Sequence, residues 1–156
     1  MKEEYKIHLL RRINLFSSLT HEELHAITGK IVVKNFKRQE AILHDEDTNE
    51  FMYCILEGEV KVVQTTGEGK EMILAMHRSG DFFGELSLID GKTAPATVLA
   101  TKDSITAIIS KKDFYSLIFN QPKVLENLLQ IFCSRIRESL QKIQMLNFSN
   151  ASQRVK

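Results

Sequence analysis

The sequence between Ile31 and Ser110 is a series of seven short runs rich in strand-forming residues: IVVKNF (31–36), EAILH (40–44), FMYCILE (51–57), EVKVVQTT (59–66), EMILAMH (71–77), ATVLAT (96–101) and SITAIIS (104–110). Turn-forming residues separate these runs, as at Glu57-Gly58-Glu59 and Ser79-Gly80-Asp81. Strands at this spacing, with no long helix between them, are typical of antiparallel barrels and sandwiches rather than of a parallel sheet. We therefore predict a β-roll or jelly roll.

Helical segments flank the β-rich region on both sides. Thr20-His-Glu-Glu23 has the pattern of a capping box, in which the two outer side chains bond each other's backbone amides, and predicts a short helix that ends near Ile27. Ser110-Lys-Lys-Asp113 repeats this helix-start signal. A second helix can begin at Pro122, because the missing N–H of proline costs nothing in the first turn.

The helix that begins near Pro122 is the longest element that the sequence predicts. Its apolar residues recur in steps of three and four that fit a heptad seam, with Ser139 as a polar member: Leu125, Leu129, Phe132, Ile136, Ile143 and Leu146. Leu128, Ile131 and Leu140 form a second apolar line, which indicates that another side of the helix packs on the β-roll. We expect this helix to form a homodimer, and a plain core helix is the alternative.

The composition favours a soluble domain inside the cell. The 156 residues are 43% apolar and carry a formal net charge of +1, which marks neither a nucleic-acid binder nor a membrane-surface protein. Cys54 and Cys133 are too few for a disulfide framework. Neither a membrane-spanning run nor a signal peptide is recognisable, so we expect a cytoplasmic location and no membrane partner.

One stretch carries a specific motif, Asp81-Phe-Phe-Gly-Glu-Leu-Ser-Leu-Ile-Asp-Gly-Lys-Thr-Ala-Pro-Ala-Thr-Val98. It resembles the phosphate-binding cassette of cyclic-nucleotide-binding domains in Crp/Fnr transcription regulators, which reads roughly F-G-E-L-S-L and, after a short gap, P-R-S-A-T-V. The resemblance extends to Leu15–Leu24, to Leu56-Glu-Gly-Glu-Val60 and to the long helix. Gln39 and Glu46 stand where relatives often have glycine, which predicts turns with positive φ at non-glycine residues.

The resemblance implies a mainly β fold with flanking helices, a double-stranded β-helix or jelly roll of the cyclic-nucleotide-binding type followed by a long C-terminal dimerisation helix. It places the sensor domain at residues 1–120, the dimerisation helix at 121–148 and a hinge at 149–156. Gly84 would let the chain bend into a short helical turn whose amides face an anion, and Glu85 would accept a hydrogen bond from a ribose hydroxyl. The ligand-binding residues that it implies are Gly84, Glu85, Leu86, Ser87, Ala94, Pro95, Ala96, Thr97 and Ser139.

The phosphate clamp of the family is altered in this sequence. Ala94 stands at the position of the family's guanidinium, and Pro95 cannot supply the backbone N–H that usually donates to a phosphate oxygen. A charge-assisted bond to phosphate is worth about 1.5–3 kcal/mol and a neutral one about 1, so the two losses together weaken binding by about a hundredfold or more. Lys92 and Arg78 are the nearest basic residues and do not stand at the family's position.

These losses disfavour cyclic AMP in the usual mode, and the sequence does not identify the ligand or any cofactor. One interpretation is a pocket retuned to another small effector. The other is that Glu85 remains as a structural cap of the cassette turn in a domain that binds nothing.

The other polar residues predict neither a catalytic site nor a metal site. His21 and His25 lie four apart and can share a helix face, but a third metal ligand is missing. A haem-binding or gas-sensing relative is therefore only an alternative. Nucleophile and base pairs in a catalytic arrangement are also missing, so we expect a protein that is not an enzyme.

The last residues, from Phe148 on, resemble the hinge that leads to a helix-turn-helix domain in Crp/Fnr regulators. The basic residues of the longer segment from Lys123 onward, interpreted as a solvated face, are Lys123, Arg135, Arg137, Lys142, Arg154 and Lys156. We expect DNA binding only through a C-terminal domain that is absent from this chain. The sequence thus predicts the effector-sensing and dimerisation domain of a Crp/Fnr-type regulator, with a scaffold domain that binds no ligand as the alternative.

Overall fold

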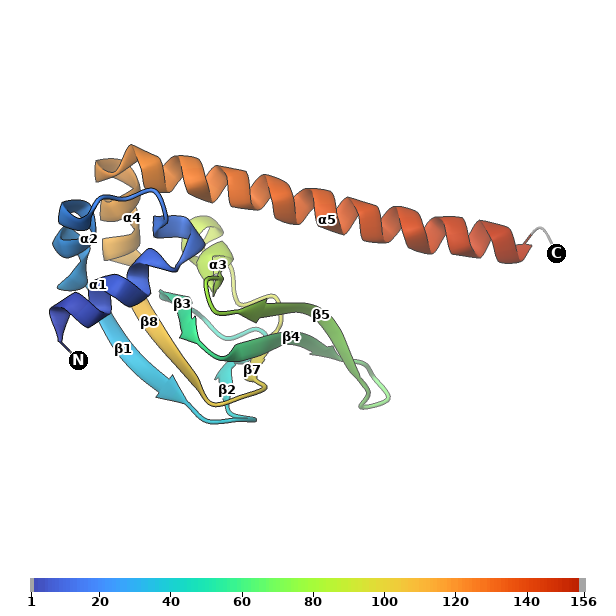
Figure 1. Cartoon of the computed structure of the whole chain (residues 1–156). Coiled ribbons are helices and arrows are strands. Elements are labelled where there is room, and N and C mark those ends of the chain that lie inside the picture. The colour runs from blue at the N-terminus through green and yellow to red at the C-terminus, as the bar shows by residue number, and fades with distance from the viewer. Residues whose placement is uncertain (1, 155–156) are drawn as a thin grey trace.

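The computed structural model describes the backbone of residues 2–154 and the side chains of residues 2–149. In chain order its elements are α1 (Glu3–Arg11), η1 (Asn14–Phe16), α2 (His21–Thr28), β1 (Ile31–Phe36), β2 (Ala41–Leu43), β3 (Phe51–Glu57), β4 (Glu59–Thr65), β5 (Glu71–Arg78), β6 (Phe82–Phe83), α3 (Glu85–Asp90), β7 (Thr97–Ala100), β8 (Ser104–Ser110), α4 (Lys111–Asn120) and α5 (Pro122–Arg154). The strands lie between the flanking helices in the sequence, as predicted (Figure 1).

Two four-stranded sheets form the β-roll. One has the strand order β1-β8-β3-β6 and the other the order β2-β7-β4-β5. Every strand pair in them is antiparallel, from Ile31 opposite Ile109 at one edge to Glu59 opposite Arg78 at the other. The predicted jelly-roll class is therefore confirmed. The helices α1, α2 and α4 gather at one end of the roll, and α5 crosses above β5 (Figure 1).

The predicted helix caps are present. The amide of Glu23 donates to Thr20 Oγ1 at 3.2 Å, and the amide of Thr20 donates to Glu23 Oε1 at 2.9 Å. This capping box begins α2, which ends at Thr28, one residue beyond the expected end. At the start of α4 the hydroxyl of Ser110 accepts from the amide of Asp113 at 3.2 Å and caps the helix. Each such cap stabilises its helix by about 1 kcal/mol.

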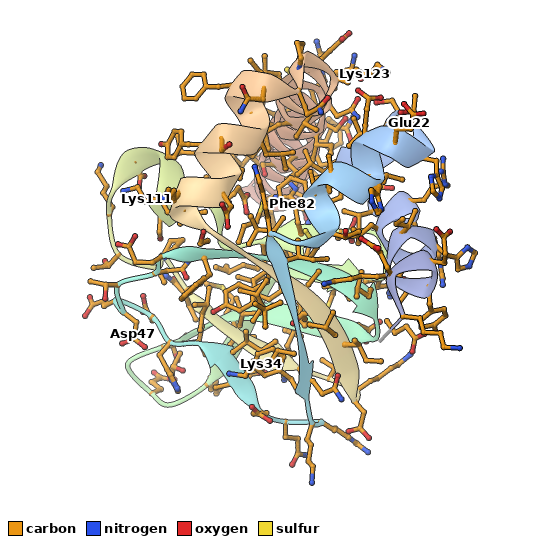
Figure 2. The ribbon with its side chains drawn as sticks, turned by 90° about the vertical axis from the view of Figure 1, so that its left-hand side faces the viewer. Glu22, Lys34, Asp47, Phe82, Lys111 and Lys123 are labelled. Atoms are coloured by element: carbon orange, nitrogen blue, oxygen red, sulfur yellow. The ribbon has the colours of Figure 1, made fainter. Side chains whose placement is uncertain are left out.

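The apolar residues form two clusters. The larger cluster joins the N-terminal helices, the β1-β8-β3-β6 sheet, α4 and the start of α5, and Phe16, Phe82 and Phe114 are its largest fully buried members. The smaller cluster fills the inside of the roll around Ile55 and Val60. Figure 2 shows Phe82 near the middle of the molecule and charged residues such as Lys123 at its rim.

Only the first part of α5 belongs to the core. Val124 and Leu128 are buried, and Ile131 and Phe132 pack against the larger cluster. Leu140 is 53% exposed, so the prediction that it packs on the roll with Leu128 and Ile131 was wrong. The physical reason is the helical repeat: Leu140, twelve residues after Leu128, points about 120° away from it. It therefore lies on the exposed side of α5 with Ile136 and Ile143, while Ser139 and Lys142 still line the pocket.

The end of α5 also differs from the predicted boundary. The helix continues past residue 148 to Arg154, so most of the proposed hinge is helical in this structure. Val155 and Lys156 lie outside the described residues, and the role of this segment as a hinge stays a prediction. Within the described part of the chain, no helix combines the length and the apolar character that crossing a membrane requires.

Candidate ligand pocket

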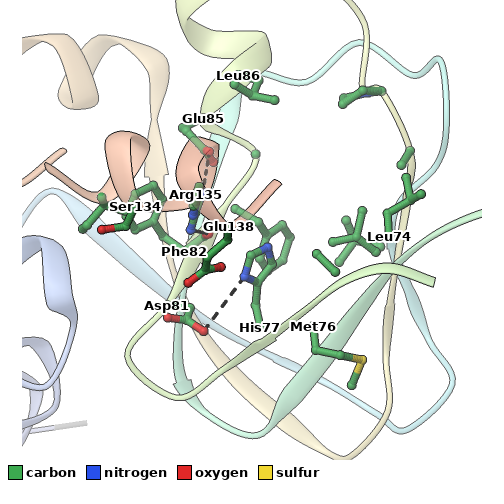
Figure 3. A pocket seen from close by; sticks show the side chains of 18 of the residues that line it. Leu74, Met76, His77, Asp81, Phe82, Glu85, Leu86, Ser134, Arg135 and Glu138 are labelled. Atoms are coloured by element: carbon green, nitrogen blue, oxygen red, sulfur yellow. Dashed lines mark hydrogen bonds and ion pairs between the residues drawn. The ribbon is translucent and has the colours of Figure 1, made fainter. Parts of the chain in front are cut away.

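A pocket of about 770 Å³ lies between the roll and α5 (Figure 3). Its walls come from the cassette around α3, from the strands β2, β4, β5 and β7, and from the middle of α5 between Asn127 and Lys142. Asn14 and Ser17, at η1, also line it. This volume is within the range of sites for small organic molecules. The cassette and the long helix therefore share one cavity, although they lie far apart in the sequence.

The cassette turn is built on Gly84. This residue has φ +90°, and a Cβ atom in its place would lie only 2.8 Å from the carbonyl oxygen of Phe51. The buried amide of Asn49 ties the turn to β3, because its Nδ2 donates to the carbonyls of Gly84 at 2.8 Å and Phe51 at 2.7 Å. The hydroxyl of Tyr115 on α4 holds the far end of α3 by donating to the carbonyl of Leu88 at 3.0 Å. Glycine is required at residue 84, as predicted.

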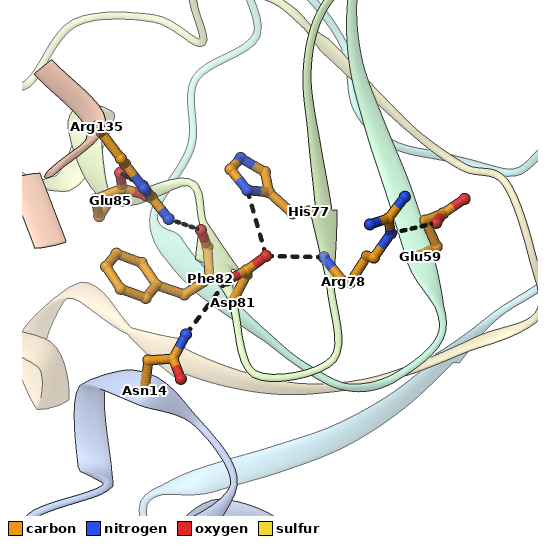
Figure 4. A network of polar contacts seen from close by, with 8 residues as sticks. All are labelled: Asn14, Glu59, His77, Arg78, Asp81, Phe82, Glu85 and Arg135. Atoms are coloured by element: carbon orange, nitrogen blue, oxygen red, sulfur yellow. Dashed lines mark hydrogen bonds and ion pairs between the residues drawn. The ribbon is translucent and has the colours of Figure 1, made fainter. Parts of the chain in front are cut away.

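Glu85 pairs with an arginine from the long helix. Arg135 Nη1 donates to Glu85 Oε1 at 2.8 Å, and Arg135 Nη2 donates to the carbonyl of Phe82 at 2.7 Å (Figures 3 and 4). The guanidinium also lies over the ring of Phe82, 4.5 Å from the ring centre. Three contacts thus fix Arg135 across the cassette and connect α5 to the first residue of α3.

Burial determines the electrostatics of this pair. The side chain of Glu85 is 5% exposed and that of Arg135 is 29% exposed. Loss of water raises the pKa of Glu85 above its ordinary value, and the adjacent charge of Arg135 acts in the opposite direction. Arg135 therefore stabilises the ionised form of a carboxylate that would otherwise be buried without a partner.

His77 of β5 forms the wall beside this ion pair. Its ring is stacked on Phe83 with an interplanar angle of 8°, and Phe83 is stacked on Tyr53 in turn. Burial lowers the pKa of His77 to about 4, with the charge of Arg135 acting in the same direction and Asp81 at 3.9 Å opposing both. Asp81 also accepts from the amide of Arg78 at 2.9 Å (Figure 4). At neutral pH the pocket therefore contains an uncharged imidazole.

The two residues at the expected clamp position, Ala94 and Pro95, line the other end of the pocket. Ala94 is 2% exposed, and its amide donates to the carbonyl of Asp47 at 2.8 Å instead of facing a ligand. Pro95 lines the pocket next to it, and the carbonyl of Pro95 accepts from the side chain of Gln64. Arg78 binds Glu59 at 2.7 Å, and neither Arg78 nor Lys92 belongs to the described residues that line the pocket. A relocated clamp from these two residues is thus not present in this structure.

The structure brings most of the predicted site residues together. Those that line the pocket are Gly84, Glu85, Leu86, Ser87, Ala94, Pro95, Ala96 and Ser139. Thr97 is not among the described lining residues, and its hydroxyl accepts from the amide of Asp45 at 3.0 Å, so its role in ligand binding stays a prediction. Ser139 faces the pocket, but its hydroxyl donates to the carbonyl of Arg135 one turn earlier at 3.0 Å.

Arg135 is one of the pocket residues that sequence reasoning missed, since it was interpreted as part of a solvated face. His77, Asp81, Glu138 and Lys142 also line the pocket without having been predicted. A signal for Arg135 was available. Ser139 was expected to face the ligand, and a residue four positions earlier lies on the same face of an α-helix. The seam residues lie on a different face of the helix: Ile136, for example, directly follows Arg135 and is 60% exposed.

Two histidines outside the pocket, His21 and His25, lie beside carboxylates of α1. His21 lies 3.2 Å from Glu4, and His25 lies 3.2 Å from Glu3. Among the described residues, no place brings together three or more side chains that could hold a metal ion. These two histidines thus have structural partners on α1.

The β-roll, the cassette and the long helix together line one pocket. The comparisons with known proteins identify the class: the family model described as the cyclic nucleotide-binding domain matches residues 33–121. This chain belongs to that family, with homology to CRP-type transcription regulators.

Three relatives illustrate this homology. The cyclic AMP receptor protein of Thermus thermophilus is 28% identical over 141 residues, which are 90% of this chain and 65% of the relative. The crystal structure of the Thermus thermophilus catabolite activator protein has a TM-score of 0.77 at 27% identity, and the match covers 86% of this chain and 63% of that one. The regulatory subunit of a cAMP-independent protein kinase A from Trypanosoma brucei has a TM-score of 0.72 at 26% identity, covering 83% of this chain and 46% of that one.

The chain thus spans slightly less than two thirds of the length of the Thermus relatives. Homologues of this type are regulators rather than enzymes, in agreement with the function class that the sequence predicts.

Proposed function

We propose that this chain is the effector-sensing and dimerisation part of a CRP-type transcription regulator, and that its effector binds between the cassette and α5. One observation carries the proposal. Arg135 of α5 contacts Glu85 of the cassette directly, and the next residue of the helix, Ile136, belongs to the exposed apolar seam. A ligand in this pocket would touch the same turn of helix that forms the expected dimer interface.

The coupling follows from the geometry of a helix. Successive helical residues point about 100° apart, so a shift of Arg135 rotates or translates Ile136 with it. Two such helices across a twofold axis would then change the placement of DNA-binding domains on a palindromic site. DNA recognition itself would reside in another domain of the regulator, as the long relatives suggest.

Cyclic AMP in the family's usual mode does not fit this pocket. Ala94 offers a methyl group where a guanidinium is needed, Pro95 has no N–H, and the amide of Ala94 already has an acceptor. Independence from cyclic AMP occurs within the same fold, since the Trypanosoma brucei regulatory subunit carries that description. We therefore assign the pocket to a different effector.

A scaffold domain that binds no ligand is the second candidate, and one observation favours it. Glu85 and Arg135 satisfy each other without a ligand, and the described residues include no buried polar side-chain atom that lacks a hydrogen-bond partner. A domain with this internal pair can be stable with its pocket filled only by water. The two candidates share one fold and differ in whether a ligand stabilises it.

A thermal-shift screen against nucleotides, small organic acids and haem separates the two candidates. A ligand at a hundred times its Kd stabilises the native state by about 2.7 kcal/mol, which raises Tm by several degrees in a domain of this size. Leu74→Trp fills the pocket from β5, where Leu74 is 42% exposed, and Ile73→Trp is the matched control at a neighbour outside the described lining. We expect a hit to stabilise the wild type and Ile73→Trp but not Leu74→Trp. Equal stabilisation of all three proteins, or none by any compound, would favour the scaffold.

A further inference from the structure

The charges of the pocket are the starting point for a statement about its ligand. Two cations line it, Arg135 and Lys142, against three carboxylates, Asp81, Glu85 and Glu138. His77 adds no charge at neutral pH, because burial lowers its pKa to about 4. The described lining therefore carries one excess negative charge, which repels an anion in a partly desolvated cavity.

Apolar side chains line the end of the pocket near Ala94 and Pro95. Ala94, Ala96 and Val98 are buried there, and Leu43 and Val62 from the roll face the same cavity. A charged group placed against these side chains would lose water without gaining a partner, which is strongly unfavourable. An apolar group would gain by the same burial.

Arg135 is not available to a second anion without a cost. Its guanidinium already donates to Glu85 and to the carbonyl of Phe82, and its flat face covers the Phe82 ring. An anionic ligand that drew Arg135 away would leave the carboxylate of Glu85 buried without a cation, and removal of one partner from a buried pair is strongly destabilising. A neutral ligand can accept or donate a hydrogen bond beside the pair and leave it intact.

We propose that the pocket selects a neutral, mainly apolar ligand, with its carbon body against the Ala94–Val98 end and a hydrogen-bonding group near Arg135 and Ser139. This inference rests on the proposed function, since it names the ligand class of the same pocket. The volume of about 770 Å³ admits a molecule of two or three rings. The negative lining and the internal ion pair together exclude phosphates and carboxylates.

A pair of fluorescent probes that differ by one charged group tests this inference. The neutral probe is N-phenyl-1-naphthylamine, and the anionic probe, 1-anilinonaphthalene-8-sulfonate, has the same rings plus a sulfonate. Both gain fluorescence in an apolar site, so titration gives the two affinities directly. We expect the neutral probe to bind at least about tenfold more tightly. Leu74→Trp should remove this binding, and Ile73→Trp should retain it, which distinguishes the pocket from the exposed apolar residues of α5.

A charge variant gives the second measurement. Leu74→Arg introduces a cation from a partly exposed position, so it tests the charge without filling the core, and Ile73→Arg is its control. The preference for the neutral probe should fall by about tenfold or more in Leu74→Arg and stay unchanged in Ile73→Arg.

The outcomes separate this inference from the proposed function. Equal or tighter binding of the sulfonate probe to the wild-type pocket would overturn the inference and leave the pocket as a ligand site. If neither Leu74 variant alters the binding of either probe, the pocket is closed, and both the inference and the proposed function fail.

Discussion

Replacement of Arg135 by alanine tests the internal ion pair. The change removes the guanidinium that donates to Glu85 Oε1 at 2.8 Å and leaves a carboxylate that is 5% exposed without a cation. Breaking a buried pair from one side costs about 3–5 kcal/mol, and the 29% exposure of Arg135 favours the lower end of this range, about 3 kcal/mol. For a domain of about 150 residues this corresponds to a fall in Tm of about 6–12 °C.

The loss should depend on pH, and the sign follows from Glu85. Burial raises the folded-state pKa of this carboxyl above its ordinary value, and the loss of Arg135 raises it further. The folded variant then binds more protons than the unfolded chain between the ordinary value of 4.5 and the raised pKa, so its stability falls as the pH rises through that window. The deficit of Arg135→Ala should be largest at neutral pH and should shrink as the pH is lowered toward 4.5.

Urea denaturation of a double-mutant cycle measures this effect. The cycle comprises wild type, Arg135→Ala, Glu85→Gln and the double variant at one protein concentration, and Arg137→Ala is the control at an exposed arginine two residues on. The loss of Arg135 leaves the buried charge of Glu85 without a partner, and Glu85→Gln removes that charge. The double variant should therefore be more stable at pH 7 than the sum of the two single losses predicts. Additive losses, or an Arg135→Ala variant as stable as Arg137→Ala, would refute the assignment of Arg135 as the partner of a buried charge.

Three further predictions concern the turn, the histidine and the seam. Gly84→Ala should lower the free energy of unfolding by about 2 kcal/mol or more, because φ is +90° and the new Cβ would meet the Phe51 carbonyl. The control Gly67→Ala should lower it far less in urea denaturation, because a Cβ at residue 67 meets nothing within 4 Å. As the pH falls from 6.5 to about 4, the wild type should lose up to about 3 kcal/mol of its free energy of unfolding through His77, because the unfolded chain binds a proton there and the folded chain does not. His77→Gln should flatten this part of the curve of stability against pH. A curve unchanged in the variant would contradict the buried neutral imidazole. Ile136→Glu should convert a dimer to a monomer in sedimentation experiments, and a wild type that is already monomeric at tens of micromolar would contradict the seam.

Much of the fold could be predicted because its signals are local. The caps at Thr20 and Ser110 act within four residues, and the strand runs are separated by turns whose residues specify them. Even the departures at Gln39 and Glu46 were predictable, since a turn that needs positive φ keeps that geometry without glycine. The structure has φ +73° and +68° at these two residues.

The cassette could be located from sequence because its geometry is also short in range. Gly84, Glu85 and Ser87 come within four residues, and the motif specifies the turn that places them in one wall. Thr97 lies outside the described lining because it begins β7, where neighbouring residues point to opposite sides and only the side of Ala96 and Val98 faces the pocket.

The contribution of α5 could not be predicted as fully, because it depends on the angle at which the helix crosses the roll. Periodicity assigns residues to faces of a helix, but it does not say which face packs against the roll or along which part of the helix it does so. Arg135 therefore looked like a surface charge, and Leu140 looked like a core residue. In the structure Arg135, Ser139 and Lys142 face the pocket, whereas Leu140 lies on the exposed side of the helix with Ile136 and Ile143.

Calorimetric titration of cyclic AMP into the wild type and into an Ala94→Arg, Pro95→Ser double variant tests most directly that this is a cyclic-nucleotide fold altered at its phosphate clamp. The double variant restores a guanidinium and a backbone N–H to a cassette that retains Gly84 and Glu85. We predict negligible binding to the wild type at micromolar concentrations and measurable binding to the variant, a gain of about a hundredfold from the two restored donors. Tight binding of cyclic AMP to the wild type, or no detectable binding to either protein, would contradict the claim that the clamp accounts for the loss of cyclic AMP affinity.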